Sequence, residues 1–355
     1  MPNCRKSLTE IQEEIIMYSR ITGTRKGDTM IRKLYIFQGT SLDPYYNLAL
    51  ERRLLERVGE GECILYLWQN QNTVVIGRNQ NAWVECRTSL LEEEGGHLAR
   101  RLSGGGAVFH DVGNLNFTFL LRDEDYDVDR QLSVIREACA LEGIRVQKSG
   151  RNDLLVEGKK FSGNAFYHHA GHAYHHGTLM IHVDKDKLSR YLSPSKAKLE
   201  AKGVASVRSR VVNLAEFSES LTCSKMRILM VRAFERVYGL TASELVLSEA
   251  DLSAIEAYRV QHESWEFLFG APLPFTFRCE GRFPWGGMEL QLKAVGGRIQ
   301  EARVYSDAMD AGLAPTLEQA LTGCPFRMDA LEAAIRTAVP ETAEDICTLL
   351  KQQQI

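Results

Sequence analysis

The most distinctive segment of this 355-residue sequence is a glycine-rich run, Arg100-Arg101-Leu102-Ser103-Gly104-Gly105-Gly106-Ala107-Val108-Phe109-His110-Asp111. Successive glycines let backbone N–H groups approach a guest closely, and arginines beside them can clamp an anion with two hydrogen bonds. The run therefore predicts a site for a phosphate or a carboxylate. It is not a Walker A loop, because no Gly-Lys-Ser/Thr follows, and the GxGxxG spacing is absent. Spacing alone leaves open a flexible turn with solvated arginines.

A second segment, Gly150 to Ala165, combines hard oxygen ligands with adjacent lysines. Asn152 and Asp153 supply the oxygens that Mg²⁺ prefers beside a phosphate. If Lys159 and Lys160 lie on a strand, they point to opposite faces, so one of them can reach a cleft. We expect the other to be solvated.

Six of the nine histidines lie between His168 and His182, which raises the question of a metal site. On a helix, His172 and His176 would share a face. Gly171 and Gly177 interrupt such a helix, and no carboxylate or thiol stands at ligand spacing. We therefore expect loop histidines, one or two of them in a pocket, rather than a zinc site.

Composition excludes several classes of function. The 43 Lys and Arg against 46 Asp and Glu give a net charge of -3, so no overall basic field would hold nucleic acid or anionic lipid. The longest apolar run, Cys63 to Trp68, falls far short of the roughly 20 residues that span a membrane. Eight scattered cysteines without a CxxC pair indicate reduced thiols. We expect a cytoplasmic protein with neither nucleic acid nor membrane as partner.

The elements that position these segments follow from hydrophobic periodicity and turn residues. Asp43-Pro44 predicts the start of a helix that runs to Leu55, with aspartate as the N-cap and proline in the first turn. The remaining expectations are a hairpin-like pair from Ile64–Trp68 and Thr73–Ile76, a half-buried strand over Asn114–Leu120, a helix over Asp129–Leu141, a hairpin around Glu157-Gly158, and mainly helices from Lys185 to Phe269.

A chain of this length usually holds more than one core, and the segment Gly270–Pro274 cannot continue a helix. We expect a tail over residues 1–29, a catalytic domain over 30–270 and an accessory domain over 271–355. Three strands are predicted in the last domain, at Phe275–Phe283, Met288–Val295 and Ile299–Tyr305, together with helices. The expected fold class is α+β.

Taken together, these motifs resemble the lipoate–protein ligases. The resemblance rests on the arginine–glycine run, on Gly150-Arg151-Asn152-Asp153 with Lys160-Phe161-Ser162-Gly163, and on His175-His176-Gly177-Thr178-Leu179. It extends from about Met30 almost to the end, through Leu67-Trp68, Ser206-Val207-Arg208-Ser209-Arg210 and Trp285-Gly286-Gly287. Leu102 and Asn164 are local departures from the family pattern.

The resemblance implies a biotin/lipoate-ligase-like mixed-sheet catalytic domain with a small α+β accessory domain. It implies that lipoate and ATP, with Mg²⁺, form lipoyl-AMP, and that the lipoyl group passes to a lysine of apo lipoyl domains of 2-oxoacid dehydrogenase E2 subunits or of the glycine-cleavage H protein. Lys160 matches the essential lysine. By the same match, ATP binding falls to Arg101, Gly106, Ala107, Val108, Phe109, Asn152, Asp153 and Lys160, lipoate binding to Leu48, Trp68, Arg101, Ser103, His110, Lys160 and His176, and the metal to Asp153.

Alternatives remain open at this point. An octanoyl or lipoyl transferase shares this fold and lysine but relays the acyl group through a cysteine, and no cysteine occurs between Cys139 and Cys223. A biotin ligase has another glycine–arginine pattern. The third alternative is a non-catalytic lipoate-binding module. The presence of Arg101, Asn152, Asp153 and Lys160 weighs against it. Leu48 and Trp68 could also be plain core residues.

Overall fold

A large mixed sheet organises the chain up to about residue 245. The computed structural model describes residues 31–150, 153–192, 211–269 and 277–353, so the predicted tail over 1–29 lies outside the described residues. The strands of the sheet are β1 (Lys33–Gln38), β2 (Glu62–Trp68), β6 (Asn114–Arg122), β7 (Gln147–Ser149), β8 (Asp153–Val156), β9 (Lys159–His169), β10 (His172–Met180) and β11 (Ala242–Glu244). Their order is β11-β1-β2-β6-β10-β9-β8-β7. β1 runs parallel to β2 and β11, and the other neighbours are antiparallel.

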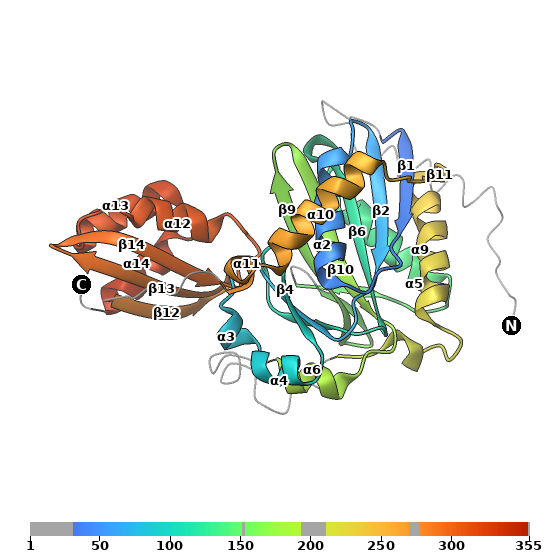
Figure 1. Ribbon diagram of the computed structural model, residues 1–355, viewed down its shortest axis with the longest axis horizontal. Coiled ribbons are helices and arrows are strands. Elements are labelled where there is room, and N and C mark those ends of the chain that lie inside the picture. The colour runs from blue at the N-terminus through green and yellow to red at the C-terminus, as the bar shows by residue number, and fades with distance from the viewer. Residues whose placement is uncertain (1–30, 151–152, 193–210, 270–276, 354–355) are drawn as a thin grey trace, which may run out of the picture.

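Helices cover both faces of this sheet (Figure 1). One face packs against α5 (Val128–Ala140) and α9 (Cys223–Tyr238), and the other against α2 (Pro44–Arg57) and α10 (Glu249–Glu263). β6 is therefore buried on both sides, from Asn114 to Leu121. The predicted strand is confirmed, but its half-buried character is wrong, because polar Asn116 and Thr118 face the packed α2 side rather than water.

The predicted start of α2 is confirmed, whereas the hairpin predicted after it is wrong. Asp43 Oδ1 accepts a 2.9 Å hydrogen bond from the Tyr45 N–H, and Pro44 is in the first turn. β3 (Thr73–Ile76) does not pair with β2. It joins β4 (His97–Arg100) and β5 (Val108–His110) in a separate sheet of order β4-β3-β5, beside α3 (Ala82–Glu85), α4 (Thr88–Glu93) and α6 (Lys185–Tyr191). Pairing with distant strands prevailed over pairing with the neighbour in sequence.

Two tight turns shape the hairpins that carry the lysines and histidines. Glu157 and Gly158 adopt φ of 50° and 75° between β8 and β9, which confirms the hairpin predicted there. Ala170 and Gly171, with φ of 50° and 74°, join β9 to β10. The expectation of loop histidines is therefore wrong for His168, His169, His172, His175 and His176, which lie on these two strands. His175 and His176 are adjacent on β10 and both are buried, because both faces of the sheet are covered at this point.

The C-terminal residues form a lobe with its own core (Figure 1). After α11 (Trp265–Phe269), the strands β12 (Phe277–Phe283), β13 (Gly286–Val295) and β14 (Arg298–Ser306) form an antiparallel sheet, which confirms the three predicted strands. The helices α12 (Leu313–Leu321), α13 (Met328–Ala338) and α14 (Ala343–Gln352) pack on it. The predicted break at 270–274 lies outside the described residues. Among the helices of the described ranges, none has the length and apolar character needed to span a membrane. The fold class is α+β, as predicted.

Candidate active site

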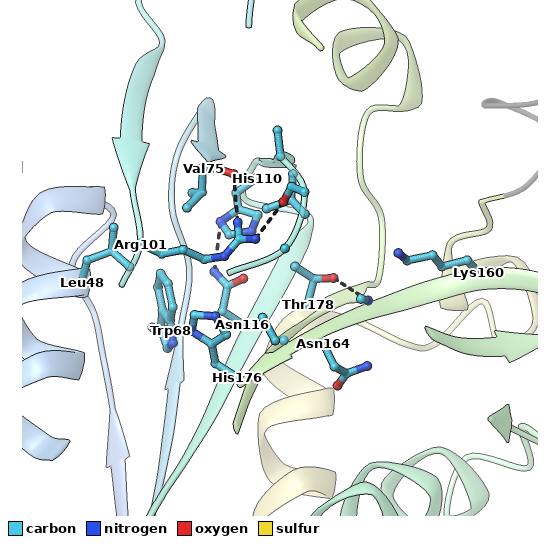
Figure 2. Close-up of a pocket in the computed structure, with 17 residues that line it drawn as sticks. Leu48, Trp68, Val75, Arg101, His110, Asn116, Lys160, Asn164, His176 and Thr178 are labelled. Carbon is cyan, nitrogen blue, oxygen red and sulfur yellow. Dashed lines mark hydrogen bonds between the residues drawn. The ribbon is translucent and has the colours of Figure 1, made fainter. Parts of the chain in front are cut away.

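A cavity of about 120 Å³ brings together residues from α2, β2, β3, β5, β6, β9 and β10. The segment between β4 and β5, residues 101–107, also lines it and is called the glycine segment below. Figure 2 shows Lys160 at one side of this cavity and Leu48 and Trp68 at the other. The predicted site residues that line it are Leu48, Trp68, Arg101, Gly106, Ala107, Val108, His110, Lys160 and His176. The cavity therefore has a cationic side and an apolar, aromatic side.

An irregularity near the start of β9 accompanies the placement of Lys160. Leu154 pairs with Ser162 but Leu155 pairs with Lys160, so Phe161 is skipped in the ladder. A bulge of this kind re-aims side chains next to it. Lys160 Nζ lies 2.7 Å from Asp153 Oδ1 on β8, and both side chains are about one third exposed. Lys159 is exposed and does not line the cavity, in line with the expectation that one of the two lysines reaches it.

The glycine segment contacts the C-terminal lobe. The Gly105 N–H donates a 2.8 Å hydrogen bond to the carbonyl oxygen of Ala308, just after β14. A Cβ atom on Gly104 would lie 2.3 Å from that oxygen and 2.5 Å from the carbonyl oxygen of Met309. Gly105 also has a φ of 88°. Close contacts with the C-terminal lobe therefore explain Gly104 and Gly105, which the sequence does not reveal. Gly105 and Gly106 also line the cavity.

Arg100 and Arg101 point to different places. Arg101 is buried and donates to Ser103 Oγ and to the carbonyl oxygens of Val75, Gly104 and Gly106, at 2.7 to 3.2 Å. Burial lowers the pKa of Arg101 to about 10, so it remains protonated at neutral pH. Arg100 instead donates to the carbonyl oxygens of Gly77, Arg78, Gln80, Phe267 and Leu268. The two arginines therefore do not form the expected clamp for an anion. The Arg100 guanidinium instead connects the loop after β3 with α11 through hydrogen bonds to backbone carbonyl oxygens.

A buried carboxylate lies behind the apolar side of the cavity, and the sequence analysis missed it. Glu51 Oε1 accepts a 2.7 Å hydrogen bond from Thr118 Oγ1 and lies 2.8 Å from His176 Nδ1. Nε2 of the same ring lies 2.8 Å from Ser103 Oγ. The carboxylate therefore orients the His176 ring. A signal existed in the sequence, since Glu51 interrupts the apolar face of α2 between Leu48 and Leu55.

His110 is a neutral histidine of the cavity wall. Its side chain is 3% exposed, and its ring lies edge-on to Trp68 with the ring centroids 6.2 Å apart. Burial, with smaller contributions from the charge of Arg101 and from His176, lowers the pKa of His110 to about 3. The ring therefore carries a single N–H at neutral pH.

Three predicted site residues among those that the structure describes, Ser103, Phe109 and Asp153, are not in the cavity wall. Ser103 lies behind His176 and Phe109 packs on Tyr191 in the core, with the ring centroids 5.5 Å apart. Asp153 reaches Lys160 from outside the wall. Asn152 lies outside the described residues. Residues of the wall that the sequence analysis did not single out include Val75, Asn116, Asn164 and Thr178.

Neither the histidines nor the cysteines form a second chemical centre in the described part of the chain. No group of three or more His, Cys, Asp or Glu side chains in residues 31–150, 153–192, 211–269 and 277–353 could hold a metal ion. His175 is buried in the core, where its Nδ1 lies 3.0 Å from Gln131 Oε1 and its Nε2 lies 2.8 Å from Asn164 Oδ1. The described cysteines are all free, and none of these lines the cavity.

Comparison with known proteins identifies the family. Residues 43–235 match the lipoyl protein ligase A/B catalytic domain, and residues 273–350 match the bacterial lipoate protein ligase C-terminus. The lipoate-protein ligase A of Psychrobacter cryohalolentis is 40% identical over 325 residues, which cover 88% of this chain and 96% of the relative. That of Bdellovibrio bacteriovorus is 39% identical over 312 residues, covering 86% and 92%.

A solved structure shares the architecture. The P. falciparum LipL1, solved in complex with lipoate, superposes with a TM-score of 0.78 at 26% identity and covers 90% of this chain and 99% of that one. The catalytic and C-terminal matches together extend over both parts of the fold described above. The chain therefore belongs to the lipoate–protein ligase family and is an enzyme of the lipoate–protein ligase A type.

Proposed function

We propose that this enzyme uses ATP to activate lipoate as lipoyl-AMP and then transfers the lipoyl group to a lysine of an apo lipoyl-carrier domain. The observation that carries the proposal is the two-sided cavity, with the Lys160 ammonium opposite Leu48 and Trp68 (Figure 2). An anionic head with an apolar tail fits such a cavity. Family membership supports the reaction, and the LipL1 structure contains lipoate.

Lys160 is the proposed catalytic residue of the first step. A carboxylate oxygen of lipoate attacks the α-phosphorus of ATP, the bond to the β-phosphate breaks, and pyrophosphate leaves. Negative charge accumulates on the phosphate oxygens during this step. The compact ammonium of Lys160, at the edge of the cavity, would neutralise that charge and the carbonyl oxygen of the adenylate. Asp153, 2.7 Å away, holds the ammonium in place before ATP arrives.

The nucleotide is proposed to lie along the glycine segment, near Arg101 and the backbone of Gly106, Ala107, Val108 and Phe109, with Asn152 and Asp153 at the phosphates. Mg²⁺ usually takes one or two carboxylates and completes its shell with phosphates and water. Asp153 is a partly exposed carboxylate beside Lys160, so the residues present fit that pattern. When bound, the ion would supply charge neutralisation at the phosphates.

The lipoyl chain is proposed to lie against Leu48, Trp68, His110 and His176, with Ser103 and Arg101 supporting these side chains. In the second step the neutral amine of a carrier lysine attacks the adenylate carbonyl, the amine loses a proton, and AMP leaves as the amide forms. The acyl group passes directly from the adenylate to the carrier lysine, without a thioester on the enzyme. In support, none of the described cysteines lines the cavity. Proposed acceptors are lipoyl domains of 2-oxoacid dehydrogenase E2 subunits and the glycine-cleavage H protein.

We also propose a catalytic domain over residues 30–270 and an accessory domain over 271–355. The separate cores, and the separate family matches at 43–235 and 273–350, support that division. We propose the cytoplasm as its location, supported by the free thiols of the described cysteines.

The test follows the two steps separately. The purified protein is incubated with lipoate, ATP and Mg²⁺, and pyrophosphate and lipoyl-AMP are measured before an apo lipoyl domain is added. We expect both products, followed by a mass increase of the carrier by one lipoyl group and release of AMP. Adenylate without carrier modification would reject the second step, and the absence of pyrophosphate would reject the first. An acyl group on the enzyme that hydroxylamine removes would favour the cysteine-relay alternative.

A further inference from the structure

Backbone contacts hold Lys160 from both edges of β9. Leu155 of β8 pairs with it along one edge. Along the other edge, Val211 forms a parallel bridge with Lys160, and the Val212 N–H donates a 2.9 Å hydrogen bond to the Lys160 carbonyl oxygen. The pairing of β9 with β10 ends at Asn164, so this short segment, and not β10, supplies the hydrogen bond at Lys160.

The residue after Val212 is anchored by its side chain. Asn213 Nδ2 donates a 3.0 Å hydrogen bond to the carbonyl oxygen of Val183, and Asn213 Oδ1 accepts one of 3.0 Å from the N–H of the same residue. Exchanging the oxygen and nitrogen of the amide would set NH₂ against N–H and oxygen against oxygen, so its orientation is fixed. Both residues are buried, so removing the side chain would take a partner from two buried backbone groups.

This anchor joins the segment to the main sheet, because Val183 lies just after β10. The backbone of Asn213 is held as well, since its N–H donates a 3.0 Å hydrogen bond to Glu216 Oε1. Val212 is itself buried, with 1% of its surface exposed. The Val212 N–H is therefore aimed at Lys160 by the fixed residue that follows it.

The backbone of β9 needs such support at this point. The ladder between β8 and β9 skips Phe161, the residue after Lys160. A bulge of this kind locally disrupts the ladder and leaves a residue unpaired. The Val212 N–H gives the Lys160 carbonyl oxygen a partner from outside the ladder. It thus helps to define the Cα position from which the lysine side chain extends.

The position of Lys160 matters for the proposed chemistry. Its side chain lines the cavity, with Nζ 2.7 Å from Asp153 Oδ1. Charge stabilisation depends on the distance between the ammonium and the phosphate oxygens, and a misplacement of about 1 Å can cost roughly 100-fold in rate. Asn213 is not in the cavity wall, so its influence on the reaction would have to pass through other residues.

We infer that Asn213 is a positioning residue for Lys160, acting through the N–H of Val212. The inference rests on the proposed function, in which the Lys160 ammonium stabilises the transition state of adenylation. It adds to that function a residue outside the cavity that fixes where the ammonium stands. A residue that only stabilised the fold would change the amount of folded enzyme, and not the turnover of each folded molecule.

Steady-state kinetics of the full-length enzyme separate these two roles. Asn213→Ala should lower kcat for pyrophosphate release about 10- to 100-fold and change KM for lipoate and ATP less than about threefold, because the cavity wall is intact. Asn213→Asp, which still accepts from the Val183 N–H, should recover part of kcat, and it replaces the alanine variant if that one fails to fold. Asp251→Asn on α10 is the control. This carboxylate is buried against Arg53 and Arg57, so removing its charge destabilises the protein and should leave kcat unchanged.

A double-mutant cycle with Lys160→Ala asks whether Asn213 acts through the lysine. If it does, replacing Asn213 should have almost no effect on the residual rate of the Lys160→Ala enzyme. The same fold loss in both backgrounds would overturn the inference, because the damage would then lie elsewhere. An unchanged kcat in Asn213→Ala would overturn it as well.

Hydrogen exchange of the full-length protein gives a readout that does not depend on turnover. The Val212 amide should be protected in the wild type and should exchange at least about 10-fold faster in Asn213→Ala, whereas the Leu290 amide in the C-terminal sheet should not change. A Val212 amide that is unprotected in the wild type, or equally protected in both proteins, would contradict the inference. If the wild type releases no pyrophosphate from ATP and lipoate, the proposed function fails, and hydrogen exchange alone decides whether Asn213 holds Val212 at Lys160.

Discussion

The backbone N–H of Gly105 donates a 2.8 Å hydrogen bond to the carbonyl oxygen of Ala308, and so joins the glycine segment to the C-terminal lobe. A backbone contact of this kind needs a chain without side chains at the crossing point. Ser306 N–H adds a hydrogen bond to the carbonyl oxygen of Asn79 nearby, at 2.8 Å. The segment proposed to hold the nucleotide is thereby in direct contact with the accessory part of the enzyme.

Replacing Gly104 should disturb this contact. The new Cβ of Gly104→Ala would lie 2.3 Å from the Ala308 carbonyl oxygen, and backbone atoms cannot swing away as a flexible side chain can. We expect a loss of about 1–3 kcal/mol in the free energy of unfolding, measured by urea denaturation. Gly59→Ala is the control, because the atoms nearest to it belong to the Glu62 side chain. A Gly104→Ala protein as stable as the control would contradict this account.

Removing the charge of Lys160 should abolish adenylation without unfolding the protein. The side chain is about one third exposed, so Lys160→Ala should leave the melting temperature within a few degrees of the wild type. Pyrophosphate release should fall by at least about 100-fold, the scale expected when one electrostatic stabiliser is lost. Lys160→Arg should recover little, because a planar guanidinium is not a compact ammonium. Exposed Lys159→Ala is the matched control, and normal turnover by Lys160→Ala would reject the assignment.

Neutralising Glu51 should impair the lipoate side of the site rather than the ATP side. In Glu51→Gln a neutral amide oxygen replaces the charged acceptor, so the hydrogen bond from Thr118 and the contact with His176 weaken and the ring is held less firmly. We expect KM for lipoate to rise several-fold and KM for ATP to stay constant, with a stability loss of about 1–3 kcal/mol. Glu56→Gln on the same helix is the control, because its side chain is 36% exposed. Equal changes in both KM values would indicate a general loss of structure.

Three buried histidines should make stability depend on pH. Burial lowers the pKa of His110 and His175 to about 3 and that of His262 to about 4. As the pH falls below about 6.5, the unfolded chain binds these protons first, so stability is fully present above that pH and is lost as the pH falls toward 3 to 4. Each histidine contributes up to about 1.4 kcal/mol per pH unit.

The free energy of unfolding, measured in urea at pH 7, 6 and 5, checks this dependence. His175→Gln should reduce the slope of the unfolding free energy against pH by up to about 1.4 kcal/mol per pH unit. This holds even if the substitution also changes the stability at pH 7. His97→Gln, at an exposed position, should keep the wild-type slope. A slope unaffected by His175→Gln would mean that His175 is protonated in the folded protein.

Local patterns predicted much of the fold. Asp43 as N-cap, the turn at Glu157-Gly158 and the three C-terminal strands all depend on residues close together in sequence, and all are confirmed. The pairing of β3 was predicted wrongly, because its partners β4 and β5 lie tens of residues away and no local signal distinguishes them from β2. The histidine strands were missed because a hairpin with polar residues on both strands lacks the apolar alternation that predicts one.

The sequence by itself determined the family, the fold class and the residue types of the site, because runs such as Ser103-Gly104-Gly105-Gly106 and Lys160-Phe161-Ser162-Gly163 are read without knowing any contact. Only the tertiary structure decided which neighbours these residues have. It separated Arg100 from Arg101, placed Glu51 behind His176, and placed the His110 ring against Trp68. The physical reason is that charge state, tautomer and donor direction depend on burial and on hydrogen-bond partners, which come together from distant strands and helices only when the chain folds.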